Sequence, residues 1–309
     1  MGARPTTFLG SQFRYLFKSF PQRKKLWHRA YFFYEIFRLL GNYAGLRLAL
    51  SRPGPAPECG GKSCVVVLLS HNRPQNMEVL VRGALQNSWV GKVIVSNSNP
   101  QYRLADWVPV RDPRLVLLER DQKPPAGRRF VLAAAEPGDY FLSVDDDIFF
   151  TPAQWTKFFE SLVQDPEAPH GISGQLYRPG VQFLNGTAFH HRENIETEVD
   201  VLIGAYAFTR RHLERLVQLA EALHLGGLSQ VANGEDILLS FSGTRPARIH
   251  DFGHPFLCAS TSLKGVALWN TRENFWEERV KLFEEVQAAR RAMDRPENAA
   301  ACPANGSPG

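Results

Sequence analysis

The chain has 309 residues, which is enough for one large α/β domain or two small ones. Hydrophobic residues make up 44% and charged residues 22%, as in ordinary soluble globular proteins, and the formal net charge of +5 suits an anionic substrate or surface. No basic run interleaved with aromatic residues lies in the body of the chain, so we do not expect nucleic acid as a partner. The four cysteines form no C-x-x-C pair, which argues against a zinc site.

Residues 1–60 differ from the rest because aromatic and basic side chains are interspersed along them. A helix that spans a bilayer needs roughly 18 uninterrupted apolar residues, and Glu35, Arg38 and Arg47 break the best candidate. The segment also lacks the short apolar core and the small-residue cleavage site of a signal peptide. We therefore expect a cytoplasmic protein with neither a signal peptide nor a spanning helix.

Two interpretations of this N-terminal segment stay open. Phe33, Ile36, Phe37 and Leu40 fall on one helical face. A basic, aromatic amphipathic helix can lie peripherally on an anionic membrane surface, and the same helix can instead pack on the folded domain. The sequence favours neither interpretation over the other.

Stretches rich in proline and glycine divide the chain. The run at 52–57 indicates a linker, and the residues from about 294 onward have the composition of a disordered tail. We therefore expect an N-terminal segment with its linker over 1–60, one folded domain over 61–290, and a disordered tail over 291–309.

Between these flanks, buried strands alternate with segments of helical spacing. Strands are predicted at 64–69, 93–95, 115–118 and 140–144, and helices at 76–85 and 130–135. This β-α-β-β-α-β order predicts a Rossmann-like, mostly parallel α/β sheet flanked by helices, with its polar strand ends on one edge. Neither a G-x-G-x-x-G nor a G-x-x-x-x-G-K-[ST] pattern follows the first strand, which argues against a dinucleotide dehydrogenase and a P-loop kinase.

Three successive carboxylates, Asp145, Asp146 and Asp147, follow the strand at 140–144, and apolar residues resume at Ile148. Adjacent carboxylates repel one another, and burying them without partners is costly. A strand end that opens into a cleft resolves this conflict, because a divalent cation can balance the acids and keep positions open for substrate phosphates. A solvated acidic turn is the alternative interpretation.

The second half of the chain contains a further acidic motif. Asn233-Gly234-Glu235-Asp236 precedes an apolar run at 237–241 that predicts a buried helix. Asp236 lies in the first turn, where the helix dipole favours a carboxylate. It is either the cap of this helix or a second site carboxylate that faces the acidic triplet. Upstream, Gly204 interrupts the apolar segment 200–209 and suggests a close backbone approach.

Together these segments resemble a known family. The stretches 64–73 (CVVVLLSHNR), 92–99 (KVIVSNSN), 144–147 (VDDD), 201–208 (VLIGAYAF) and 233–241 (NGEDILLSF) follow the order of motifs in GT-A glycosyltransferases. The region from about 63 to 285 is most similar to the C-terminal catalytic domain of the exostosin family. The Gly-Glu-Asp form also resembles inverting GT-A enzymes of the cellulose and hyaluronan synthase family, so a retaining and an inverting outcome both stay open.

The resemblance implies a metal-dependent transferase with a GT-A fold, whose second half faces the acceptor. The donor would be a UDP-sugar, such as a UDP-N-acetylhexosamine, and the acceptor a carbohydrate or another hydroxyl of a glycoconjugate. Mn²⁺ or Mg²⁺ would be bound by Asp147 and Asp145, with His254, or alternatively His250, as a further ligand. Asp236 would be catalytic, with Glu235 next in line. The donor pocket would comprise Ser70, Asn72, Arg73, Asn97, Arg128, Arg129, Asp145, Asp146 and Arg279.

Arg279 allows two interpretations. It could reach the donor diphosphate, as the late arginine of the family does. Its neighbours three and four residues away are not acidic, so no intrahelical ion pair accounts for its charge. Its stem could instead cover apolar surface while its head stays in water.

Two other functions compete with the transferase. A nucleotidyltransferase also combines a Rossmann-like sheet with acidic metal ligands. It would be expected to have a glycine-rich phosphate loop after the first strand, where this chain has Ser70-His71-Asn72-Arg73. A silent binding module would be expected to have lost Asp147 or Asp236, and both are present.

Overall fold

The computed structural model describes residues 7–20, 26–58, 60–119, 126–181, 188–260 and 273–294. Most of the tail expected over 291–309 therefore lies outside the described residues. The last described helix, α8 (Phe275–Met293), extends into the first residues of that expected tail.

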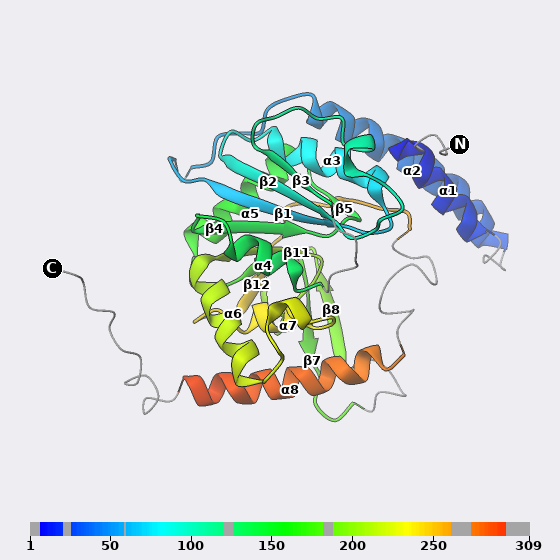
Figure 1. Ribbon diagram of the computed structural model, residues 1–309. Coiled ribbons are helices and arrows are strands. Elements are labelled where there is room, and N and C mark those ends of the chain that lie inside the picture. Colours follow the sequence, from blue (N-terminus) through cyan, green and yellow to red (C-terminus); the bar gives the residue numbers. More distant parts are fainter. Residues whose placement is uncertain are drawn as a thin grey trace.

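A mixed central sheet organises the molecule (Figure 1). Its strands are β1 (Cys64–Ser70), β2 (Val90–Asn97), β3 (Leu115–Leu118), β4 (Tyr140–Val144), β6 (His170–Gly171), β9 (Thr197–Val199), β11 (Ala205–Thr209) and β12 (Ala247–Ile249). Their order is β3-β2-β1-β4-β11-β6-β12-β9, and the first four are parallel. The expected Rossmann-like α/β fold is confirmed.

The register brings the predicted polar strand ends to one edge. Ser70 at the end of β1 lies opposite Asn97 at the end of β2. Leu68 lies opposite Val144, so the acidic triplet that follows Val144 leaves the sheet at this same edge. Parallel strands place their carboxyl ends together, and this edge is where open α/β sheets bind ligands.

The two faces of the sheet are covered by different helices. Successive side chains of a strand point to opposite faces, so Val66 and Leu68 pack with α3 (Pro74–Leu85) and α5 (Pro152–Gln164). Val65 and Val67 pack on the other face with α4 (Arg128–Ala134), α6 (Arg210–Ala222), α7 (Glu235–Ser240) and α8. Both faces of the sheet are therefore buried.

Local sequence signals explain where two of these helices begin. Thr151 and Gln154 form a capping box at the start of α5, with Pro152 at its first position. Thr209 and His212 form the same reciprocal pair at the start of α6. Each pair satisfies two backbone groups that a helix start would otherwise leave without partners.

The apolar segment predicted at 200–209 is divided at Gly204. Val201–Leu202 forms β10, which joins a smaller sheet with β7 (Ser173–Tyr177) and β8 (Phe189–Glu193), whereas β11 joins the central sheet. Gly204 has φ +74°, and a Cβ at this position would lie 2.7 Å from Cδ1 of Ile148. Its carbonyl accepts a 2.7 Å hydrogen bond from the Asp145 amide. The close backbone approach expected at this glycine is confirmed.

The N-terminal helices α1 (Phe8–Ser19) and α2 (Leu26–Leu50) pack on the α3 side of the domain (Figure 1). Six of their apolar side chains join the core, and each such burial contributes roughly 1.5–3 kcal/mol. These helices are therefore part of the fold. The buried residues are Phe8, Leu16, Phe32, Leu39, Leu46 and Leu50.

The proline-rich stretch at 52–57 is also tied to the domain. The Gly54 amide donates to the Gln86 carbonyl over 2.9 Å, and the Thr156 hydroxyl donates to the Pro55 carbonyl over 3.1 Å. A Cβ on Gly54 would collide with the Asn87 side chain. Among the helices of the described ranges, none is both long enough and apolar enough to cross a membrane.

Candidate functional site

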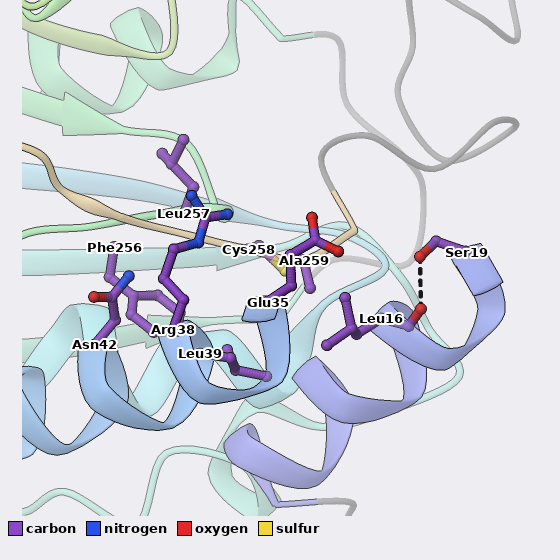
Figure 2. A pocket seen from close by; sticks show the side chains of 10 residues that line it. All are labelled: Leu16, Ser19, Glu35, Arg38, Leu39, Asn42, Phe256, Leu257, Cys258 and Ala259. Carbon is purple, nitrogen blue, oxygen red and sulfur yellow. Dashed lines mark hydrogen bonds between the residues drawn. The ribbon is translucent and has the colours of Figure 1, made fainter. Parts of the chain in front are cut away.

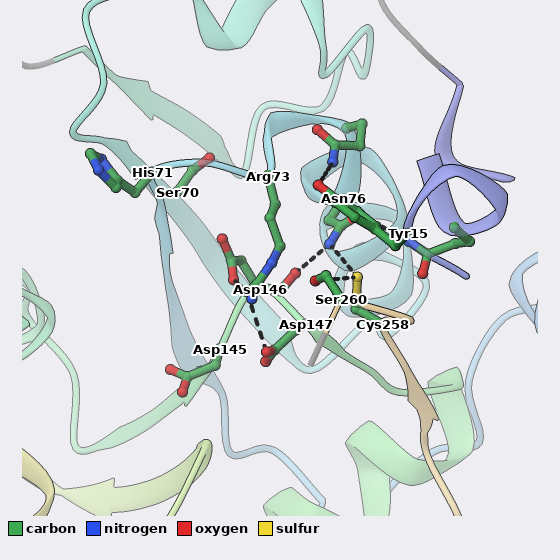
Figure 3. A network of polar contacts seen from close by, with 12 residues as sticks. Tyr15, Ser70, His71, Arg73, Asn76, Asp145, Asp146, Asp147, Cys258 and Ser260 are labelled. Carbon is green, nitrogen blue, oxygen red and sulfur yellow. Dashed lines mark hydrogen bonds and ion pairs between the residues drawn. The ribbon is translucent and has the colours of Figure 1, made fainter. Parts of the chain in front are cut away.

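The acidic triplet lies at the carboxyl end of β4 and is met by two arginines. Asp146 and Asp147 both lie beside the Arg73 guanidinium, whereas Asp145 lies apart from it (Figure 3). Arg73 pairs with Asp146 and lies 3.3 Å from the nearest Asp147 oxygen. Arg129 donates to Asp145 over 2.8 Å. The triplet is therefore not a solvated turn, because two largely buried guanidinium groups oppose its charge.

A buried network of hydrogen bonds holds the backbone of Asp146 and Asp147 in place. Asn76 donates its amide to the Asp146 carbonyl over 2.7 Å. Gln12 of α1 lies within 3.4 Å of the Asn76 side chain and accepts from the Ala259 amide over 2.8 Å. The Cys258 amide donates to the Asp147 carbonyl over 2.8 Å. The first helix of the chain is thus linked through Asn76 to the acidic triplet (Figure 3).

Sequence reasoning missed this supporting network. Asn76 could have been noticed, because a buried asparagine inside an amphipathic helix is unfavourable unless its amide is hydrogen-bonded. Gln12 gave no comparable signal, since it lies 64 residues from its partner in a segment that we interpreted as separate.

Arg129 connects the two acidic motifs. Its guanidinium lies 2.8 Å from Asp145 and 4.0 Å from Glu235. It also lies over the ring of Tyr206, 5.0 Å from the ring centroid, which contributes a cation–π contact. The sequence predicted Arg129 near the acids but did not predict Tyr206, which is fully buried beneath it.

Asp236 and Arg279 form a buried, bidentate ion pair. The two guanidinium Nη atoms of Arg279 donate to the two carboxylate oxygens of Asp236 over 2.9 and 2.8 Å. Both side chains are less than a tenth exposed. The interpretation of Arg279 as a head group in water is therefore wrong. The Ile237 amide also donates to Asp236, so this carboxylate is bound on both oxygens and is more than a helix cap.

Glu235 differs from its neighbour because, among the described residues, no arginine lies within hydrogen-bonding distance of it. Its side chain is 11% exposed, and the nearest guanidinium is that of Arg129 at 4.0 Å. Burial, with the charge of Asp236, raises the pKa of Glu235 to about 7. A carboxyl group with a pKa near neutrality is suited to proton transfer.

Asp146 also has a raised pKa. Burial raises its pKa to about 7, and the charges of Asp147 and Asp145 add to this effect, which the nearby Arg73 opposes. The two acidic motifs together hold five carboxylates, whereas three guanidinium groups pair with them. With all of these groups ionised, two negative charges are left over.

The remaining donor-pocket candidates lie around the same edge. Asn97 is buried. Its side-chain nitrogen donates to the Glu119 carboxylate and to the Asn99 and Tyr102 carbonyls, and its side-chain oxygen accepts from the Asn99 backbone amide. Asn97 therefore holds its own loop. The Ser70 hydroxyl pairs with the Tyr102 hydroxyl over 2.9 Å. The other two candidates reach the surface: Asn72 is exposed, and Arg128 is half-buried at the start of α4.

The structure does not bring the candidate histidines to the acids. His250 pairs with Glu196 and with His170, 2.8 Å from each. His254 is exposed in the loop before β13 (Phe256–Leu257). Within the described ranges, no three His, Cys, Asp or Glu side chains are grouped so that they could hold a metal ion.

Figure 2 shows a cavity of about 300 Å³ between α1, α2 and β13. Its walls include Leu16, Leu39 and Phe256, and Arg38 also lines it. Cys258 connects this cavity to the acids, because it lines the cavity and donates its amide to Asp147. The cavity is therefore linked to the backbone of the acidic triplet through Cys258.

The raised pKa of Glu235 predicts a pH dependence of stability. Between pH 4.5 and about 7, the folded protein retains a proton that the unfolded chain has lost. The free energy of unfolding should therefore fall as the pH rises through this window. In Glu235→Gln, which cannot ionise, part of this slope should disappear, as measured by urea unfolding at intervals of pH. Glu198→Gln, an exposed control, should keep the full slope, and an unchanged slope in both variants would contradict the prediction.

Comparisons with known proteins bear on the fold. No protein-family model and no curated protein matches the chain. Among solved structures, the chain is similar to GalNAc-T7 with UDP, GalNAc and Mn²⁺, with a TM-score of 0.50 and 10% identity over 77% of this chain. The match covers 52% of that protein, so the chain spans about half its length.

A second similar structure is CMP:2-keto-3-deoxy-manno-octonic acid synthetase complexed with CTP. The TM-score is 0.36 and the identity 14%, over 53% of this chain and 83% of that one. This similarity is too weak to carry an argument. The likeness to GalNAc-T7, at its low identity, shows the fold alone: the chain has a GT-A-like α/β fold.

Proposed function

We propose that the protein is a metal-dependent glycosyltransferase that uses a nucleotide-sugar donor. The observation that carries this proposal is the charge of the site. Among the described residues, five carboxylates meet three guanidinium groups at the ligand-binding edge of the sheet, and a divalent cation would balance this excess of acids. The GT-A-like fold supports the proposal, and within that fold we propose the exostosin family on the order of the sequence motifs.

The donor set fits Mn²⁺ or Mg²⁺ that binds together with a diphosphate. Mg²⁺ commonly takes one or two carboxylates and completes its coordination with substrate phosphates and water. Asp145 is the most exposed of the three acids, at 36%, and Asp147 is 18% exposed and lies 3.3 Å from Arg73. They would hold the cation, and we no longer include His254. The metal would neutralise charge on the departing diphosphate.

Arg73, Arg129 and Asp146 would position the donor side of the site. Arg73 pairs with Asp146 and lies 3.3 Å from Asp147, so it would hold both carboxylates in place. Arg129 holds Asp145 close to Glu235 and would keep the donor sugar between the two acidic motifs. Asn72 and Arg128 would contact the nucleotide at the surface, whereas Ser70 and Asn97 would shape its loops.

Glu235 is our candidate for the catalytic base. Asp236 came first in the sequence interpretation, but the Arg279 guanidinium occupies both of its oxygens, so it is engaged as an ion-pair partner. Glu235 would take the proton from the acceptor hydroxyl as the new glycosidic bond forms and the bond to the diphosphate breaks. This role favours an inverting outcome. The Asp236–Arg279 pair would be a positioning element, and the carbohydrate acceptor would enter from the second half of the chain.

We further propose that residues 61–290 form the catalytic domain and that α1 and α2 complete its core. Removing residues 1–50 would therefore disrupt the protein rather than only detach a peripheral segment. The contacts of Gln12 and the six buried apolar side chains of these helices support this proposal.

A donor screen tests the function. The purified full chain is incubated with each common nucleotide-sugar, with Mn²⁺, with Mg²⁺ or with a chelator, and nucleotide release is measured. We expect release from a UDP-sugar such as UDP-N-acetylhexosamine, which stops when the metal is chelated. Release of pyrophosphate from a nucleoside triphosphate and a sugar phosphate would instead indicate a nucleotidyltransferase. Turnover that persists with the chelator would overturn the metal dependence.

A further inference from the structure

The outer face of helix α2 carries large aromatic side chains. Phe37 is 73% exposed, Trp27 63% and Phe33 60%. The exposure continues along the helix and onto α1. The other large hydrophobic residues exposed on these helices are Phe17, Tyr31, Tyr34, Leu40 and Leu48.

The opposite face of α2 is packed into the domain. Phe32, Leu39, Leu46 and Leu50 are buried, and at 100° per residue they lie across the helix from Phe37. Helix α2 is therefore apolar on its inner face and aromatic on its outer face. A helix on the surface of a water-soluble domain normally has a polar outer face, and larger apolar patches mark interaction sites.

Exposed cations border this aromatic band. Arg29 and Arg47 lie along one edge of it and Arg38 along the other, given the same helical spacing. Arg14 and Lys18 of α1 are exposed as well. The only carboxylate of the two described helices is the half-buried Glu35. The surface is thus both aromatic and positively charged.

We propose that this surface, the docking face, binds an anionic lipid bilayer with α2 lying in the plane of the interface. The docking face consists of the eight exposed hydrophobic residues and the five exposed cations just named. Aromatic side chains favour the membrane–water interface, and basic side chains at the edges of an apolar band are attracted to anionic headgroups. A spanning helix is not needed for this mode of binding.

The charge of the docking face favours a bilayer over a second copy of the chain. Two identical faces in contact would bring five cations of one copy against five of the other, with one carboxylate on each. Like charges across an interface oppose association, whereas an anionic lipid surface complements all five.

The docking face is rigidly connected to the acidic site. Phe32 on the inner side of α2 packs against Phe20, with ring centroids 4.7 Å apart, and α1 continues through Gln12 to Asn76 and Ala259. Arg38 lines the cavity that separates this face from Cys258 (Figure 2). A bilayer on the docking face would therefore hold the site at a fixed orientation to the membrane.

Vesicle sedimentation tests the proposal with the full chain and needs no substrate. Vesicles of phosphatidylcholine alone are compared with vesicles that also contain phosphatidylglycerol, at low and at high salt. We expect the wild type to sediment with the anionic vesicles only, and less so at high salt. The variant Arg29→Gln/Arg47→Gln should bind about 25-fold more weakly, at about fivefold for each arginine. Phe33→Ser/Phe37→Ser should lose on the order of tenfold or more.

A matched control is Ile195→Ser, which removes an exposed apolar side chain from the turn between β8 and β9. It should bind like the wild type, and circular dichroism melting should show that all variants are folded. Equal binding to both kinds of vesicle, or no binding by the wild type, would overturn the proposal. Light scattering that shows a wild-type dimer and a monomeric Phe33→Ser/Phe37→Ser would reassign the docking face to self-association and overturn it too.

Discussion

Replacing Asp236 with asparagine should destabilise the protein by about 3–5 kcal/mol, because it leaves the buried Arg279 guanidinium without its counter-charge. For a chain of this size that corresponds to a drop in melting temperature of roughly 10 °C. A residue that only capped its helix would predict little change, since asparagine caps nearly as well as aspartate. Thermal unfolding followed by circular dichroism distinguishes the two expectations.

The control for this prediction is Asp294→Asn. Asp294 also pairs with arginines, Arg290 of α8 and Arg215 of α6, but its side chain is 46% exposed. This substitution should cost less than about 1 kcal/mol. The double variant Asp236→Asn/Arg279→Gln should recover part of the stability lost by Asp236→Asn, because the orphaned charge is removed. If Asp236→Asn melts like the control, the buried pair contributes little and the capping interpretation stands.

Replacing Asp147 with asparagine should abolish metal-dependent turnover. In our proposal Asp147 is one of the two carboxylates that hold the cation, and losing a direct metal ligand should cost at least as much as losing a supporting group. We therefore expect a loss in rate on the order of 10²-fold or more. The measurement is nucleotide release over a range of Mn²⁺ concentrations, where a weakened site also shifts the metal requirement upward.

Asp139→Asn makes the same chemical change just before the opposite end of β4, at an exposed position. It should leave turnover and the metal requirement unchanged. Near-normal activity of Asp147→Asn at ordinary Mn²⁺ concentrations would remove this residue from the metal site, and the proposal would then depend on Asp145 alone.

The part of the sheet formed by β1 to β4 could be predicted from the sequence, because it repeats one pattern of apolar strands and connecting segments. Strands β1 to β4 are continuous apolar runs separated by helical spacing or turns, so their order and their common polar edge followed directly. The acidic triplet was found because its charge contradicts the apolar residues on both sides. In each case the signal lies within about ten neighbouring residues, which is the range over which periodicity carries information.

The partners of the site residues could not be predicted in the same way. Arg279 binds an acid 43 residues earlier, and Gln12 reaches an asparagine 64 residues later. Such pairs depend on how helices pack against one another, and no spacing along the chain encodes that. For this reason the sequence ranked Asp236 above Glu235, whereas the structure shows that Asp236 is bound by an arginine and Glu235 is not.

The order of Gln12, Asp236 and Arg279 along the chain has a consequence for protein synthesis. Chains emerge from the ribosome N-terminus first, and domains generally fold as units. A nascent chain that has exposed β1 to β4 already has Gln12, but Asp236 has no counter-ion until α8 has followed. Asp236 can therefore pair with Arg279 only after residue 279 has been translated, and termination before that residue would leave Asp236 without its guanidinium partner.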